Sequence, residues 1–115
     1  MNVFFVIAPK GGGKPELITA PLDGTILPGV TRRTVLELCR NSGDYTVSER
    51  ALGMKEVSEA AAEGRLMEAF GTGTAAVIAP INCVLFKGKV RLLVVKLKVP
   101  HRLCPSSLTL LVTCL

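Results

Sequence analysis

The stretch Asp23-Gly24-Thr25-Ile26-Leu27-Pro28-Gly29-Val30-Thr31-Arg32 decides how we interpret this chain, because a turn in it leads directly into an expected helix. The proline fixes φ before the turn, and Gly29 lacks a Cβ that would block a close ligand. Thr31 is expected to cap the helix, whose first unpaired amides then suit a bound phosphate. Taken alone, such a Pro-Gly turn more often indicates a simple connection.

The charge of the chain is concentrated at one end. Of its 115 residues, 1–89 contain ten Lys or Arg against nine Asp or Glu, whereas 90–115 contain four Lys or Arg and no acid. The net charge of +5 therefore says little about what the body of the chain binds, and we expect no nucleic-acid partner. The length suffices for one small domain.

Few residues are candidates for metal or nucleophile chemistry. The four cysteines have spacings that match no zinc or redox motif, and the single histidine, His101, lies near the C-terminal end. We therefore expect no metal site and no histidine-dependent nucleophile in residues 1–89.

Hydrophobic periodicity predicts an α/β fold for residues 1–89. The expected strands cover residues 3–8, 16–19, 44–51, 66–70, 75–80 and 84–87, and the expected helices cover 32–41 and 54–63. Gly53 stands where an N-cap is expected, and Gly43 and Gly64 are expected to end the two helices. The run Lys10-Gly11-Gly12-Gly13-Lys14 lacks the Ser or Thr that follows Gly-Lys in a P-loop, so it predicts a hairpin tip.

A second glycine-rich turn is expected at Gly71-Thr72-Gly73-Thr74-Ala75-Ala76. It fits the letters of the dinucleotide fingerprint, but no helix start follows and no Asp or Glu occurs after Glu68 to hold a ribose. Its small residues can simply make a sharp turn. Alternatively, the hydroxyls of Thr72 and Thr74 and the amides of Thr74 and Ala75 face a bound anion.

Several motifs in order and spacing resemble a known family. Asn2-Val3-Phe4, Leu17-Ile18-Thr19 and Leu27-Pro28-Gly29-Val30-Thr31-Arg32 are similar to the latter part of the class IV aminotransferase signature. Val47-Ser48-Glu49-Arg50 and Phe70-Gly71-Thr72-Gly73-Thr74-Ala75 resemble branched-chain amino acid aminotransferases of eukaryotic type. The resemblance covers about residues 1–89. It implies part of the large C-terminal domain, with a mixed, barrel-like sheet and two helices.

The resemblance also implies a cofactor, pyridoxal 5'-phosphate, and a reaction, amino transfer between leucine, isoleucine or valine and 2-oxoglutarate. The residues that match the cofactor-binding positions of the family are Leu27, Gly29, Val30, Thr31 and Thr74. Thr74 and Ala75 match the positions that bind the substrate carboxylate. The substrates would be amino acids and 2-oxo acids, the full-length family is usually dimeric, and its members occur in cytoplasm and mitochondria.

The catalytic groups of the family have no match here. Its Schiff-base lysine and the tyrosine at the cofactor ring belong upstream of the matched region, and the glutamate at the pyridine nitrogen would stand five positions before Asn2. We therefore expect the isolated chain to be inactive. The alternative is a non-catalytic truncated isoform that acts as an interaction module with a full-length enzyme.

The resemblance ends near Lys89. Residues 90–115 are expected to be a hydrophobic and basic tail that does not belong to the family, and disorder is one interpretation of it. A membrane anchor is another, but the last apolar run, from Leu108, is shorter than the ~20 residues of a span, so we expect no membrane partner. Altered splicing or a gene-model error is a third hypothesis, which transcript sequencing across codons 88–92 tests.

Overall fold

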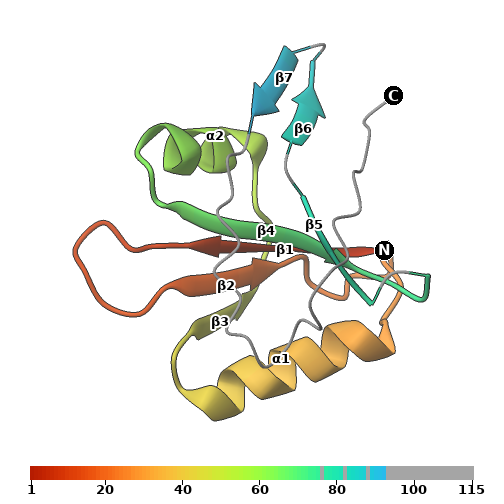
Figure 1. The fold of residues 1–115 in the computed structure, drawn as a ribbon. Helices are drawn as coiled ribbons and strands as arrows, with labels where there is room; N and C mark the ends of the chain where they lie inside the picture. The colour runs from red at the N-terminus through yellow and green to blue at the C-terminus, as the bar shows by residue number, and fades with distance from the viewer. Residues whose placement is uncertain (76, 82, 88, 93–115) are drawn as a thin grey trace.

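A computed structural model describes residues 1–75, 77–81, 83–87 and 89–92 (Figure 1). Strands and helices follow in the order β1 (Asn2–Ile7), β2 (Glu16–Thr19), α1 (Val30–Ser42), β3 (Thr46–Glu49), α2 (Met54–Ala62), β4 (Leu66–Thr72), β5 (Ile78–Pro80), β6 (Cys83–Phe86) and β7 (Lys89–Leu92). Every expected strand and helix is present, with ends that differ by up to three residues. The α/β class predicted from the sequence is confirmed.

The main sheet has five strands in the order β3-β2-β1-β4-β5, and β6 and β7 form a separate two-stranded sheet. Neighbouring strands of the main sheet are antiparallel except β2 and β3, which are parallel. The expected barrel-like sheet is wrong for the described residues: the sheet is open. Closure would require the edge strands β3 and β5 to pair with each other, and they lie at opposite ends of the strand order.

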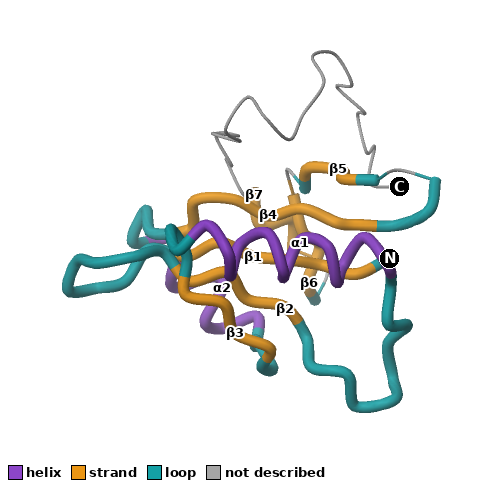
Figure 2. Tube along the Cα trace, turned by 90° about the horizontal axis from the view of Figure 1, so that it is seen from below, coloured by secondary structure: helices purple, strands orange, loops and turns teal. Residues whose placement is uncertain are grey.

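The two helices cover opposite faces of this sheet, as α/β layers require (Figure 1). One core cluster joins buried Phe4, Val6 and Leu17 to Leu36 of α1. The other joins Ile7 and Ile18 to Ala60 of α2. Successive residues of a strand thus point to opposite faces of the sheet. This alternation, with a period of two residues, is the sequence pattern that predicts a strand. Figure 2, seen from below, looks onto α1 as it crosses the sheet.

Helix α1 begins two residues before its predicted start. Its N-cap is Gly29, in an extended conformation (φ −65°, ψ 144°), with no side-chain cap. The prediction that Thr31 caps the helix is wrong, because Thr31 is already the second helical residue. The backbone sets this start: the Arg33 N–H donates to the Gly29 carbonyl at 3.1 Å.

Glycines at the other helix ends behave as predicted. Gly43 follows α1 with φ 71°, and Gly64 follows α2 with φ 70°, both in the left-handed region that favours glycine. Gly53 is the N-cap of α2, also as predicted. The Lys10-to-Lys14 run forms the tip of the β1–β2 hairpin, which confirms that prediction.

The predicted boundary between residues 89 and 90 falls within β7, which pairs antiparallel with β6. The remaining predictions for the tail concern residues 93–115, which lie outside the described residues. Among the residues that are described, no helix is long and apolar enough to cross a membrane.

Candidate anion site at the start of helix α1

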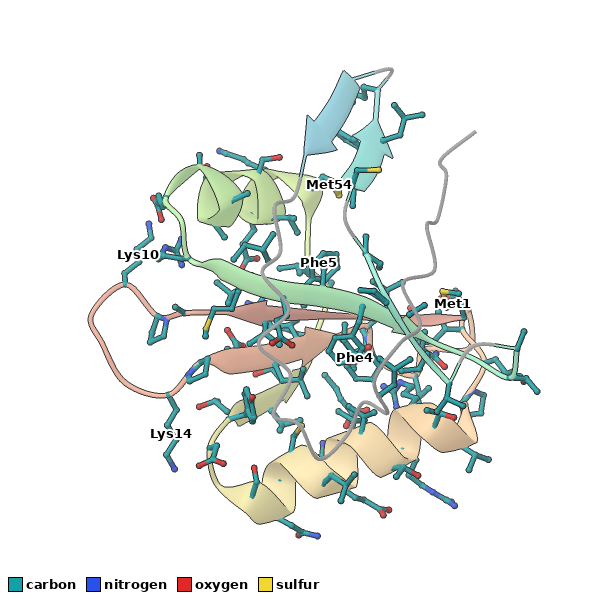
Figure 3. The ribbon with its side chains drawn as sticks, viewed as in Figure 1. Met1, Phe4, Phe5, Lys10, Lys14 and Met54 are labelled. Atoms are coloured by element: carbon teal, nitrogen blue, oxygen red, sulfur yellow. The ribbon has the colours of Figure 1, made fainter. Side chains whose placement is uncertain are left out.

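Both turns that the sequence singles out lie at one end of the molecule. Figure 1 shows the N-terminus, the start of α1 and the end of β4 at the same side of the sheet. Met1 is labelled at this end in Figure 3, whereas Lys10 and Lys14 lie at the far end of the sheet. We call residues 27–31, the turn and the first residues of α1, the cup.

The cup exposes hydrogen-bond donors. The first bond of α1 is the one from Arg33 to Gly29, so the amides of Val30, Thr31 and Arg32 precede it and have no acceptor within the helix. No other described residue accepts a hydrogen bond from them. The Val30 side chain is 73% exposed, and the first turn contains no acidic residue. The positive end of the helix dipole is therefore not neutralised by the helix itself.

Asn2, at the start of β1, fixes the cup from the sheet side. Its Nδ2 donates a hydrogen bond to the Leu27 carbonyl at 2.9 Å, and the side chain is part of the buried interior. A Cβ at Gly29 would lie 2.6 Å from Asn2 Oδ1, closer than such atoms approach in proteins. The sequence suggests that Gly29 makes room for a ligand, but the atom nearest to that space belongs to Asn2.

Arg32 fixes the first turn of α1 from the buried side of the helix. It is 3% exposed, and its Nη2 donates to the Ala20 carbonyl at 2.9 Å and to Glu49 Oε1 at 2.7 Å. Arg40 donates to the other oxygen of the same carboxylate at 2.8 Å. These bonds hold the pKa of Glu49 below its ordinary value. The helix start is thereby tied to the ends of β2 and β3.

Sequence reasoning missed Arg32 as an interior residue. A signal was present, because Arg32 stands three and four positions before Val35 and Leu36 and so shares their inward helix face. A charged side chain on that face predicts a buried partner. The partner, Glu49, comes from a strand beyond the helix, which periodicity alone does not reveal.

The second turn is shorter than predicted. Strand β4 continues through Gly71 and Thr72, so the turn begins at Gly73. Thr72 pairs with Asn2 across the sheet and is 1% exposed, so its hydroxyl belongs to the interior and not to an exposed anion site. Thr74 and Ala75 are exposed. We therefore retain only these two residues of the turn as candidates.

The two turns meet at the N-terminal residues of the chain. A Cβ at Gly73 would lie 3.9 Å from Met1 Cα, and the cup touches Asn2, the next residue. The structure thus places Thr74 and Ala75 at the same end as the cup.

The interior beneath this end is polar. The buried polar residues of the described chain are Asn2, Thr19, Arg32 and Thr72. Two of their atoms, Arg32 Nε and Thr72 Oγ1, have no hydrogen-bond partner among the residues that the structure describes. Buried polar atoms without partners are uncommon in folded proteins and call for a specific explanation. Both residues belong to the parts of the fold that hold the cup, because Arg32 lies in the first turn of α1 and Thr72 pairs with Asn2.

The chain belongs to the amino-transferase class IV family, whose model matches residues 1–84. Within it, the chain is similar to branched-chain-amino-acid aminotransferases. It is 50% identical to the mitochondrial one of Schizosaccharomyces pombe over 91 residues, covering 76% of this chain and 21% of the relative. It is 49% identical to the cytosolic one of Saccharomyces cerevisiae over 92 residues, covering 77% of this chain and 24% of the relative.

A solved structure supports the same assignment. The fold is similar to that of an aminotransferase from Brucella abortus bound to the cofactor pyridoxal phosphate, with a TM-score of 0.52 and 32% identity. The match covers 70% of this chain and 24% of that chain. The chain thus spans between a fifth and a quarter of the length of these relatives.

Proposed function

We propose that the cup holds the phosphate of pyridoxal 5'-phosphate, with Leu27, Gly29, Val30, Thr31 and Thr74 as the cofactor-binding residues. The observation that carries this proposal is the set of outward amides at Val30 and Thr31, which have no acceptor among the described residues. A phosphate supplies the acceptor oxygens and negative charge that such a helix start lacks.

The residues present fit this cofactor group. Leu27 and Val30 are 78% and 73% exposed, so neither side chain is buried in the packed interior and the cup lies at the surface. No carboxylate in the first turn competes for the same donors. When bound, the cofactor supplies an electron sink, and the residues of this chain bind and orient it.

The wider function that we propose is amino transfer between leucine, isoleucine or valine and 2-oxoglutarate. Thr74 and Ala75, which are exposed residues, would bind the substrate carboxylate with their backbone amides. As in the family that the sequence resembles, the complete protein would be a homodimer in cytoplasm or mitochondria. The named relatives include both a mitochondrial and a cytosolic protein.

We expect no catalysis by this chain alone. No lysine of the sequence matches the Schiff-base lysine of the family, and Lys10 and Lys14 lie at the end of the sheet opposite the cup (Figure 3). Lys10 pairs with Glu63 at 3.6 Å. Borohydride reduction of the full chain with pyridoxal phosphate, followed by peptide mass spectrometry, tests this. A stoichiometric adduct on one lysine would contradict the expectation.

Phosphate binding is best tested by deleting one amide. Val30→Pro removes the N–H at the first helical position, where proline is well tolerated and where the extended Gly29 suits a following proline. The matched control is Met54→Pro at the first position of α2, which follows Gly53 in a similar conformation (φ −81°, ψ 151°). Pyridoxine 5'-phosphate is the probe, because it carries the phosphate but no aldehyde that could react with lysines.

We expect Val30→Pro to weaken binding of pyridoxine 5'-phosphate by about tenfold, since a hydrogen bond to a charged group contributes roughly 1.5 kcal/mol or more. Met54→Pro should leave binding unchanged, and pyridoxine without phosphate should bind more weakly to every variant. Equal affinity of the Val30→Pro variant and the unmodified chain, measured by calorimetry, would contradict the proposal.

A second candidate function is that of a non-catalytic interaction module for a full-length enzyme. The observation in its favour is β5, an edge strand among the described residues, where Ile78 is 39% exposed and the preceding Val77 is 65% exposed. Exposed apolar residues on an unpaired edge favour association with another chain. Co-purification with a full-length branched-chain aminotransferase would support this function. A soluble monomer that does not bind the enzyme would contradict it.

A further inference from the structure

We propose that Asn2 is a positioning residue for the cup, and that glycine is required at position 29 because Asn2 occupies the space of a side chain there. This inference rests on the proposed phosphate site. It assigns a role to a residue that does not itself touch the phosphate.

The hydrogen bond from Asn2 is what ties the loop to the sheet. Loop residues 21–28 make local bonds, such as those of Thr25 to the Asp23 carboxylate. Among the described residues, the bond from Asn2 Nδ2 to the Leu27 carbonyl alone reaches this loop from another element. Asn2 is itself held in β1, paired with Thr72 of β4. The hydrogen bond from Asn2 therefore holds the cup in a fixed position relative to the central strands of the sheet.

Both polar atoms of the Asn2 side-chain amide contact the cup. While Nδ2 donates to Leu27, Oδ1 lies against Gly29, 2.6 Å from where its Cβ would be. The other atoms near that Cβ, Arg32 Cβ at 3.7 Å and Asn2 Cγ at 3.8 Å, are at ordinary contact distances. The φ of Gly29, −65°, is one that alanine adopts readily. The obstacle to a larger residue is therefore Asn2 and not the backbone conformation.

This contact sets where the first amide of the helix points. The peptide that joins Gly29 to Val30 carries the Val30 N–H, and its orientation follows from the ψ of Gly29, 144°. A shift of Gly29 away from Asn2 would turn that amide. Asn2 therefore acts on phosphate binding through Gly29 and Leu27, without contact.

The inference is tested by a double-mutant cycle in the full 115-residue chain. The variants are Asn2→Ala, Gly29→Ala and the double substitution. Two matched controls make the same changes elsewhere: Asn41→Ala at the exposed far end of α1, and Gly53→Ala, whose Cβ would meet no atom of the described residues within 4 Å. The readouts are affinity for pyridoxine 5'-phosphate, the amide resonances of Val30 and Thr31, and thermal unfolding.

We expect Asn2→Ala to weaken binding by about fivefold, the value of one typical hydrogen bond. Gly29→Ala should weaken it by about tenfold, as expected for a steric clash in a packed site. In the Asn2→Ala background, Gly29→Ala should cause no further loss, because the clashing oxygen is gone. The controls should bind as the unmodified chain does. Should Gly29→Ala fail to fold, the double variant should nevertheless fold.

Three results would overturn the inference in distinguishable ways. Equal loss from Gly29→Ala in both backgrounds would show that the ligand, and not Asn2, requires the glycine. Unchanged affinity and unchanged Val30 and Thr31 resonances in Asn2→Ala would remove the positioning role while the cup stands. Absence of binding by the unmodified chain would reject the proposed function itself, and with it this role, even where thermal unfolding still shows the Asn2–Gly29 coupling.

Discussion

The N-terminal ends of helices α1 and α2 have similar backbone conformations but different surroundings. Each has an extended glycine as its N-cap, Gly29 or Gly53, and neither has a side-chain cap. The first turn of α2 contains Glu56, which accepts a hydrogen bond from Arg50 at 2.7 Å, whereas the first turn of α1 contains no acid. No atom of the described part of the chain lies within 4 Å of where a Cβ at Gly53 would be, while Asn2 fills the corresponding space beside Gly29.

The comparison teaches that a helix start is not a site by itself. At α2 the carboxylate of the helix balances the positive dipole end, so nothing further is required there. At α1 the balancing charge is absent, and the glycine and the first turn are held by Asn2 and by buried Arg32. A fixed but uncompensated helix start is the arrangement that an external anion can complete.

The largest expected difference concerns the ion pairs beneath the two helix starts. Glu49→Gln removes the carboxylate that faces Arg32, whose side chain is 4% exposed, so we expect a loss of about 2–3 kcal/mol in unfolding free energy. Glu56→Gln breaks a pair with Arg50 in which both side chains are more than a third exposed, and it should cost at most about 1 kcal/mol. Urea unfolding of both variants measures this. Equal losses would contradict the difference in burial.

The two cap glycines should differ next. Replacing either glycine by alanine weakens the cap by a similar amount, so this effect cancels between them. Gly29→Ala also forces a clash with Asn2, and we expect it to be about 1–3 kcal/mol more destabilising than Gly53→Ala. Chemical denaturation of the two variants side by side tests this. Equal free energies of unfolding would show that the cup accommodates the added methyl group at no energetic cost.

Acid should act on the α1 start through Glu49. Its pKa is lowered from 4.5 in the folded chain, mainly by its hydrogen bond with Arg32, so the unfolded chain binds the proton more readily. Glu49 therefore contributes stability above pH 4.5, and this contribution is lost as the pH falls through the folded pKa. Glu49→Gln should flatten the stability curve as the pH falls from about 5 through the lowered pKa of Glu49. An unchanged slope in that range would contradict the assignment.

The smallest expected effect is a change made to α2. Glu56→Gln removes the carboxylate from its first turn, and the amides of Met54 and Lys55 should then respond weakly to millimolar phosphate. In the unmodified chain the same amides should not respond. Nuclear magnetic resonance titration measures both, and no response in the variant would mean that the dipole at α2 alone attracts no anion.

Local patterns in the sequence predict the elements of this fold well. The apolar face of α1, with Val35, Leu36 and Cys39, packs in one core cluster as predicted. Gly43 and Gly64 end their helices because a positive φ is a property of single residues, visible without tertiary context. Predictions of this kind depend only on a few residues that are close together in the sequence.

The parts that the sequence does not predict depend on distant partners. Asn2 reaches Leu27 across 25 positions, and Arg32 reaches Glu49 across 17. The start of α1 moved from the predicted Arg32 to Val30 because the Gly29 carbonyl accepts the first helical bond. The openness of the sheet likewise follows from strand order, which no single segment encodes. The turn chemistry of Pro28 and Gly29 indicates the cup as a weak anion site, and the family resemblance adds the roles of its residues, but Asn2 and Glu49, which support it, are evident only in the structure.

The most direct test of the account is a titration of the full chain with pyridoxine 5'-phosphate, followed through backbone amide resonances. We predict saturable shifts of Val30 and Thr31, with Met54 and Lys55 at the start of α2 unmoved. Shifts of equal size at both helix starts, or none at Val30 and Thr31, would contradict the claim that α1 alone is built to hold a phosphate.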